Sequence, residues 1–522
     1  MGLRSAGFDG KFATAVVVAL VWDLTLFQLR LTGGALGALE LALLGAALLA
    51  RPALLRDRRA LACFGLAGVM AVAMMIMPGL LAWTLFWVFA GVGTMLPAAT
   101  RFGDAWCWLQ RLVVHGLRSI VAPLLDGRRW LRVRRSRGNG QIRAILPQLV
   151  LPALGSAVVL GLFAMANPVI EAWLSEAALL SPDGEFISRI LLGSIWFTLA
   201  WSLLRPRMAR SLINTFEGSG DLSLPGVTPA SVRLSLIAFN GLFALQNAMD
   251  LAWLWGLAPL PDGMTLAEYA HRGAYPLIVT ALLAAGFVLV ALRPGSQTAD
   301  MPVVRRLVVL WVAQNVLLVA NAALRTLDYV AAYSLTSLRI AALLWMGLVA
   351  VGLVLVLWRM MHGKTAGWLI NANAAAALVV LCGCSFVDLE AVAARYNIAA
   401  ARDLGGSGAP LDICYLQAAG PSALVALAEL ERRPAPEPIG LWARLLRENA
   451  QVQLSEELAQ GDWSLLALVR LAAVRARLRR AALAPRQHAW VDCHSRDPRV
   501  LRAVLGQGVM AQSPALTAPT KP

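Results

Sequence analysis

The chain has 522 residues, of which 59% are hydrophobic and only 15% are charged, and its mean hydropathy is +0.66. Soluble domains carry about 25% charged residues, so this composition excludes an ordinary soluble protein and predicts an integral membrane protein. The net charge is +16, but the arginines lie mostly in loops between apolar segments. That distribution indicates membrane topology and anionic lipid headgroups, and no nucleic acid, as the reason for the charge.

Long apolar segments recur along the chain and predict an all-α fold, a polytopic transmembrane helical bundle of about eleven spans with a C-terminal helical extramembrane domain. A span needs roughly 20 mainly apolar residues. The segments that meet this requirement are 11–29, 33–50, 60–77, 79–98, 146–167, 186–204, 232–256, 275–293, 307–324, 335–358 and 367–386. We group them into N-terminal spans within 1–100 and a main core at 146–386, with a basic loop at 101–145 between them.

Arginine and lysine are distributed unequally between alternate loops. One set holds 22 of them and the opposite set holds 3. The basic set consists of loops 51–59, 101–145, 205–230, 292–306 and 359–366. Because cytoplasmic loops are enriched in these residues, we expect a cytoplasmic N-terminus. An odd number of spans then places the C-terminal region outside the cytoplasm, and one span more or fewer would reverse that side.

The loop 101–145 is the most basic part of the chain. Arg111, His115 and Arg118 share one helical face while the leucines lie elsewhere on the same turns, which predicts a helix lying in the membrane interface. Two interpretations remain open. The loop either anchors the topology or recognises an anionic lipid headgroup or an acidic protein domain.

After the last span, charged residues occur throughout, and the apolar residues recur with the spacing of an α-helix. We therefore predict a helical extramembrane domain at 387–510 and a disordered tail at 511–522. A protein partner could bind through 387–510. If this domain lies outside the cytoplasm, Cys414 and Cys493 could pair in an oxidising space, although sequence alone does not establish their geometry.

Polar side chains form stripes within the predicted spans 232–256 and 307–324. Polar groups are costly in hydrocarbon, so each stripe must face protein or water. Several ionisable groups also fall at the predicted outer ends of neighbouring helices. The resulting cluster is Asn240, Asn247, Asp250, His271, Arg272, Gln314, Asn321, Arg325, Asp328 and Arg339.

A buried carboxylate needs a cation or hydrogen-bond donors around it, so we expect Asp250 to pair with Arg325 or with Arg339. The cluster has two interpretations. It is either structural, because hydrogen bonds between membrane helices contribute about 0.6 kcal/mol each on average, or a site open to the outer face that binds a small polar or anionic ligand.

Catalytic signatures are absent from the sequence: it has no P-loop, HExxH or GxSxG motif and no helix with paired metal ligands. We therefore predict no cofactor and no metal, and favour a protein that is not an enzyme. His271 beside Asp250 or Glu268 could still act in acid–base chemistry, and Asp492-Cys493-His494 resembles a metal or thiol fragment. Asp23 and Glu40 lie within the first two spans, where lone carboxylates can carry protons.

Several stretches of the chain resemble a known family. They read AFNGLFALQNAMDLAWLWG, EYAHRGAYPL, NAALRTLDYVAAYSLTSLRI and LDICYLQAAGPSALVAL. These stretches resemble domain-of-unknown-function family 4173, an uncharacterised family of bacterial polytopic membrane proteins. The resemblance covers roughly residues 200–425 and implies a multi-pass protein of the bacterial inner (plasma) membrane. It implies no activity, cofactor or catalytic residue.

Three functional hypotheses follow from the sequence. The first is a transporter-like or ligand-binding membrane protein with its polar site at the outer ends of the spans around 232–339. The second is a signalling or assembly scaffold that displays a helical extracytoplasmic domain, without transport or catalysis. The third is a membrane enzyme acting on lipid-linked substrates through His271 and Asp250.

Overall fold

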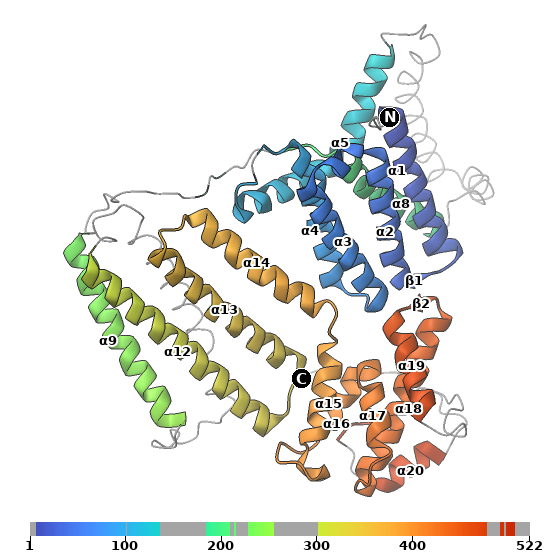
Figure 1. Ribbon diagram of the computed structural model, residues 1–522. Helices are drawn as coiled ribbons and strands as arrows, with labels where there is room; N and C mark the ends of the chain where they lie inside the picture. The colour runs from blue at the N-terminus through green and yellow to red at the C-terminus, as the bar shows by residue number, and fades with distance from the viewer. Residues whose placement is uncertain are drawn as a thin grey trace, which may run out of the picture.

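The computed structural model of the chain is almost entirely helical in the part that it describes (Figure 1). The described residues are 7–100, 102–135, 184–208, 213, 215, 228–254, 301–477, 491–494 and 497–506. Within them the strands are two residues long, β1 (Thr32–Gly33) and β2 (Asp462–Trp463), and they pair in parallel. Two groups of membrane helices and a C-terminal helical domain make up the described fold.

The first group is an N-terminal bundle with a core of alanine, leucine and aromatic side chains. Its helices are α1 (Phe8–Asp23, continued as a π-helix at Leu24–Gln28), α2 (Gly34–Ala50), α3 (Arg58–Ile76), α4 (Leu80–Met95), α5 (Ala105–Arg135) and α8 (Gly184–Leu204). Short 3-10 segments at Pro52–Arg56 and Leu96–Ala98 follow α2 and α4. Helix α2 is rich in alanine and glycine, and it lies so close to α3 that a Cβ atom on Gly37 would be 2.3 Å from the Ala71 carbonyl oxygen.

Helix α5 lies within the predicted basic loop. Its His115 is buried against the bundle, while Arg118 and the apolar side chains Leu117 and Ile120 are exposed. Burial lowers the pKa of His115, and the nearby Arg51 guanidinium lowers it further. The exposed apolar stripe is what an interfacial helix presents to lipid, and lipid binding at this helix stays a prediction. Residues 136–145 of the predicted loop lie outside the described residues.

The second group of membrane helices lies side by side in Figure 1. It consists of α9 (Pro229–Leu254), α12 (Pro302–Tyr333), α13 (Ser337–Met361) and α14 (Ala366–Cys384). Thr336 and Thr365 cap α13 and α14 by accepting hydrogen bonds from the main-chain N–H groups of Arg339 and Trp368. The Asn371 side chain of α14 joins the two groups, because it accepts from the N–H of Ala105 at 2.8 Å and donates to the Gly103 carbonyl at 3.1 Å.

The C-terminal domain has two apolar cores of its own. Its helices are α15 (Leu389–Ala400), α16 (Ile413–Ala419), α17 (Leu424–Leu430), α18 (Glu437–Ala459), α19 (Leu465–Arg477) and α20 (Pro498–Gly506), with 3-10 turns at Arg402–Leu404 and Gly420–Ala423. The fully buried Arg447 of α18 forms ion pairs with Glu431 and Glu448. A disulfide joins Cys414 of α16 to Cys493.

Eight described helices are long and apolar enough to cross a membrane. Seven of them coincide with predicted spans; the eighth, Ile413–Leu430, comprises α16, a 3-10 turn and α17 of the C-terminal domain, and its apolar side chains pack within that domain. The predicted count of eleven is not confirmed. Helix α2 has only 17 residues, α9 is not among the eight, and the predicted spans 146–167 and 275–293 lie outside the described residues.

Replacing Gly37 and Gly45 of α2 by alanine tests the close packing of this helix. Gly45 faces open space, with nothing within 4 Å of an added Cβ, so Gly45→Ala should be neutral or gain about 0.5–1 kcal/mol from helix propensity. Gly37→Ala should instead lose about 1–3 kcal/mol through overpacking against α3. Thermal unfolding of both variants in detergent measures the difference, and equal midpoints would contradict the observed α2–α3 contact.

Candidate functional site

A ladder of amide hydrogen bonds joins α9 to α12. The Asn240 Nδ2 atom donates to the Leu307 carbonyl at 3.1 Å, and its Oδ1 accepts from Gln314 Nε2 at 2.7 Å. One step further, Asn247 Nδ2 donates to the Gln314 carbonyl at 3.1 Å, and its Oδ1 accepts from Asn321 Nδ2 at 3.4 Å. Each asparagine of α9 therefore donates to the backbone and accepts from a side chain of the neighbouring helix.

The spacing of the ladder explains why the helices meet along it. Asn240 and Asn247 are seven residues apart, and so are Gln314 and Asn321. A seven-residue repeat keeps one face of each helix on the partner over several turns. The residue numbers rise together along both helices, so α9 and α12 run parallel. We call these contacts, together with the ion pair described next, the polar ladder.

The polar ladder ends in an ion pair between Asp250 and Arg325. The Arg325 Nη2 atom lies 3.0 Å from Asp250 Oδ2, and Gln246 Nε2 donates to the other carboxylate oxygen at 3.0 Å. Only 1% of the Asp250 side chain and 7% of the Arg325 side chain are exposed. A pair this deeply buried is held by mutual compensation, because removal of one partner leaves a bare charge in a medium of low dielectric.

The remaining predicted site residues are not part of this pair. The Arg339 guanidinium donates to the Tyr333 carbonyl at 2.7 Å and to the Ser334 carbonyl, and lies 4.2 Å from the centre of the Tyr329 ring. It therefore caps the C-terminal end of α12, where the helix dipole favours a cation. Asp328 is exposed and takes no part in the described ion pairs, while His271 and Arg272 lie outside the described residues.

Two amides that the sequence analysis did not select belong to the same region. Gln246 supports Asp250, and Asn315 is buried one position after Gln314. The Oε1 atom of Gln314 and the Oδ1 atom of Asn315 are buried without a hydrogen-bond partner within the described residues. Gln246 lies four residues before Asp250, a spacing that puts two side chains on one helical face, so the sequence did contain a signal for it.

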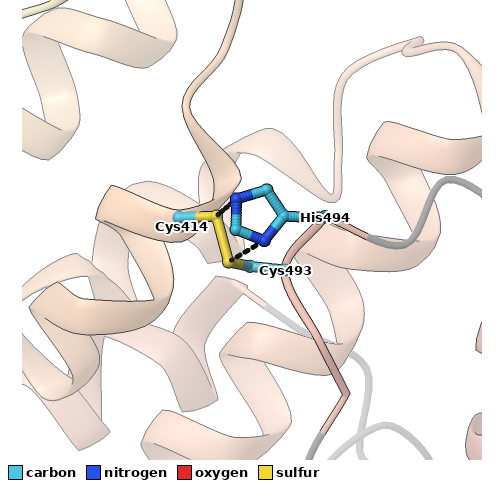
Figure 2. A group of neighbouring side chains, drawn as sticks. All are labelled: Cys414, Cys493 and His494. Atoms are coloured by element: carbon cyan, nitrogen blue, oxygen red, sulfur yellow. Dashed lines mark hydrogen bonds between the residues drawn. A yellow bond between two sulfur atoms is a disulfide. The ribbon is translucent and has the colours of Figure 1, made fainter. Parts of the chain in front are cut away.

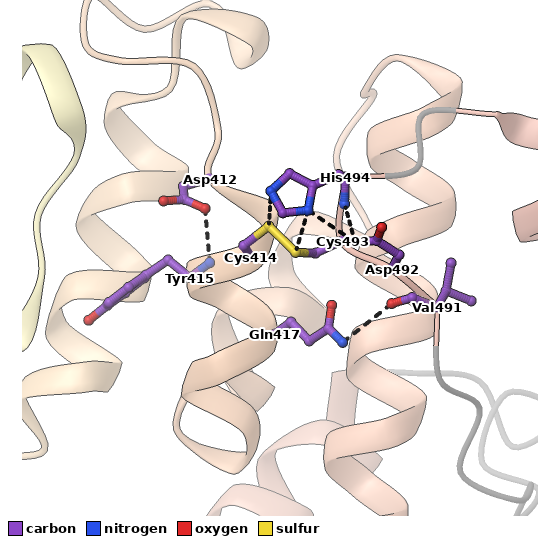
Figure 3. Close-up of a disulfide and its surroundings, with 8 residues drawn as sticks. All are labelled: Asp412, Cys414, Tyr415, Gln417, Val491, Asp492, Cys493 and His494. Atoms are coloured by element: carbon purple, nitrogen blue, oxygen red, sulfur yellow. Dashed lines mark hydrogen bonds and ion pairs between the residues drawn. A yellow bond between two sulfur atoms is a disulfide. The ribbon is translucent and has the colours of Figure 1, made fainter. Parts of the chain in front are cut away.

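Figure 2 shows a second group of reactive side chains, in the C-terminal domain. Cys414 and Cys493 are joined by a disulfide, and the ring of His494 lies over it, with Nε2 3.8 Å from the Cys414 sulfur and Nδ1 3.6 Å from the Cys493 sulfur. Asp492 Oδ1 lies 3.0 Å from His494 Nδ1 (Figure 3). Hydrogen bonds from the His494 main chain and ring lower the pKa of Asp492.

The disulfide determines whether this second group can bind a metal ion. A metal ion is bound by thiolates, and sulfurs that are bonded to each other offer none. The predicted metal or thiol fragment at Asp492-Cys493-His494 is therefore a covalent link in this structure. It fixes α16 to the segment that precedes α20.

The comparisons with known proteins give a family but no activity. The family model described as "Domain of unknown function (DUF4153)" matches residues 43–430. This range contains the whole polar ladder and Cys414 and ends before β2 and Cys493. The predicted family number 4173 is not confirmed. No curated protein and no solved structure matches the chain.

A double-mutant cycle tests the buried ion pair. Asp250→Asn and Arg325→Gln should each destabilise the protein by about 3–5 kcal/mol, because each leaves one buried charge unpaired. The double variant should lose clearly less than the sum of the two, which is the signature of a direct interaction. Unfolding of the purified protein in mixed micelles measures all three values.

The matched control for this cycle is Asp328→Asn, which removes an exposed carboxylate from the same end of α12. Its effect should stay within about 0.5 kcal/mol. Strict additivity of Asp250→Asn and Arg325→Gln would show that the two groups do not interact.

Proposed function

The chain belongs to the DUF4153 family, and from this premise we propose that it is a multi-pass membrane scaffold that displays a disulfide-closed helical domain on the extracytoplasmic side of the bacterial inner membrane. The observation that carries the proposal is the docking of one C-terminal domain on both groups of membrane helices (Figure 1). A transporter needs parts that move past one another, whereas this domain links the two groups of membrane helices.

The first docking contact lies at the turn between α12 and α13. Asn397 of α15 accepts from the Leu335 N–H at 2.7 Å and donates to the Leu335 carbonyl at 2.8 Å. The Tyr415 hydroxyl accepts from the Ser337 N–H at 3.2 Å, and Val330 packs with Leu335 against Ala393. Asn397 is buried, so its paired hydrogen bonds with a main-chain residue define one orientation of the domain on this turn.

The second docking contact lies on the N-terminal bundle. The pairing of β1 with β2 places the Thr32 N–H 3.0 Å from the Gly461 carbonyl. Gly461 has φ +88°, and a Cβ atom there would lie 1.9 Å from the Arg30 carbonyl oxygen. Only glycine allows the two backbones to approach so closely. The C-terminal domain thus contacts the loop between α1 and α2 through its main chain.

Two independent arguments support an extracytoplasmic C-terminal domain. Both docking contacts lie at the helix ends opposite to the basic segments, since α2 runs from β1 to Arg51 and α13 runs from Ser337 to Arg359. Basic segments mark the cytoplasmic side. In addition, a disulfide persists in an oxidising compartment such as the periplasm.

The polar ladder supports a scaffold more than a transport path. Its amides bond to each other and to main-chain carbonyl groups of α9 and α12, and Asn240 and Asn247 are buried. Amides satisfied in this way hold helices together. The anionic headgroups expected at α5, and a protein partner on the outer surface of the C-terminal domain, complete the proposed interactions.

A second candidate function, binding of a small polar ligand from the outer side, is favoured by one observation. Gln314 Oε1 is a buried acceptor without a described partner in the middle of the polar ladder. A ligand that donates a hydrogen bond would satisfy it. The two functions differ in whether water reaches Gln314.

Cysteine accessibility tests the proposed topology. In a chain whose free cysteines Cys63, Cys107, Cys382 and Cys384 are replaced by serine, a membrane-impermeant maleimide applied to intact spheroplasts should label Arg433→Cys and not Lys364→Cys. Both side chains are exposed, and the proposal places them on opposite sides. Labelling of Lys364→Cys alone would invert the topology and refute an extracytoplasmic scaffold.

The same chain without free cysteines also distinguishes the proposed scaffold function from the ligand-binding function. Asp328→Cys, which is exposed near the outer end of α12, should react with the impermeant reagent. Gln314→Cys lies about 21 Å further along the same helix at 1.5 Å per residue, and under the scaffold proposal it should stay unlabelled. Rapid labelling of Gln314→Cys from outside would instead indicate a water-filled path and favour ligand binding or transport.

A further inference from the structure

Helix α1 carries Asp9 in its first turn and Asp23 at its C-terminal end, and helix α2 carries one carboxylic acid, Glu40. Asp23 and Glu40 differ in their partners. Asp23 of α1 is paired with Arg189 of α8, at 3.0 Å from Nε and 2.6 Å from Nη2. Glu40 of α2 is 0% exposed, and neither Oε1 nor Oε2 has a hydrogen-bond partner within the described residues. An acid without donors or a cation at this depth requires a separate explanation.

The surroundings of Glu40 are apolar and tightly packed. One turn before it, Gly37 lies against the main chain of α3 and against Met75. One turn after it, Leu43 and Leu44 belong to the apolar core of the N-terminal bundle. Helix α2 also packs against α1 and α8. Interiors packed like this have little room for ordered water.

Among the described residues, no cation forms an ion pair with Glu40. The charged residues on the elements packed against α2, and in the segments that flank it, are Asp9, Lys11, Asp23, Arg30, Arg51, Arg56, Asp57, Arg58, Arg59, Glu185, Arg189 and Asp462. Among the described ion pairs Arg189 is paired with Asp23 and with Glu185, and Arg59 with Asp57. None of the described ion pairs includes Glu40.

An ionised carboxylate without a partner in such a place would be very costly, and buried groups of this kind become neutral instead. We infer that Glu40 is a proton-binding site: its carboxyl group holds a proton at neutral pH inside the N-terminal bundle. Loss of that proton would place a bare charge between α2 and α3. Release therefore requires α2 to move or water to enter, which is how intramembrane acids couple protons to conformational change.

The position of Glu40 indicates from which side the proton is exchanged. It lies seven residues from Gly33, about 10 Å along the helix, and eleven residues from Arg51. The β1–β2 pair and Asp462 of the C-terminal domain lie at the Gly33 end of α2. The shorter path from Glu40 thus leads to the face on which the C-terminal domain is docked.

Infrared spectroscopy of the full chain in lipid nanodiscs tests this inference. At pH 7 the wild-type protein should show the C=O stretch of a protonated carboxylic acid, with the expected shift in deuterated buffer. Glu40→Gln should lose this band, and Asp23→Asn should keep it. Glutamine is almost isosteric with the neutral acid, so Glu40→Gln should also unfold at the wild-type temperature. Absence of the band in the wild type, or its persistence in Glu40→Gln, would overturn the assignment.

A chemical readout keeps the inference testable even if Glu40→Gln does not fold. A hydrophobic carbodiimide adds to protonated carboxyl groups in apolar surroundings, with the acid proton passing to a carbodiimide nitrogen as the carboxyl oxygen bonds to its central carbon. Mass spectrometry of the wild-type protein should find the adduct on Glu40 and none on Asp23, and alkaline pH should reduce it. As a control, Glu40 should react after the chain is unfolded in acidic detergent. If Glu40 passes this control but stays unmodified in the folded protein while Asp23 is labelled, the inference is contradicted.

Discussion

The cost of exposing amides and charges to hydrocarbon is the constraint on which this structure depends. In the second helix group that cost is avoided because α9 and α12 present their polar side chains to each other. The same interactions define the register and the parallel direction of the two helices. The ladder then ends in the buried pair of Asp250 and Arg325, which adds charge compensation to the alignment.

The C-terminal domain contacts both groups of membrane helices. It contacts the α12–α13 turn through Asn397 and the α1–α2 loop through the β1–β2 pair. The disulfide between Cys414 and Cys493 closes the domain itself. One domain attached to two helix groups fits a scaffold. Helix α2 differs from this pattern, because its buried Glu40 has no hydrogen-bond partner among the described residues.

Much of the site could be predicted from sequence, because helical periodicity alone decides which side chains share a face. Helical periodicity selects Asn240, Asn247, Asp250 and Arg325. It could not choose between Arg325 and Arg339, since Arg339 is turned back to cap α12 by the Ser334 turn at φ 69°. Periodicity could not show that Glu40 has no hydrogen-bond partner among the described residues. Nor could it establish the geometry of the pairing between Cys414 and Cys493, which the sequence offered only as a possibility.

The most direct measurement is an electron cryomicroscopy structure of the full chain in a lipid nanodisc, at a resolution that shows side-chain amides. We expect the Asn240 side chain at hydrogen-bond distance from Gln314, and Asp250 at hydrogen-bond distance from Arg325, between parallel helices α9 and α12. A structure in which these side chains face lipid, or lie on opposite sides of the bundle, would contradict this prediction.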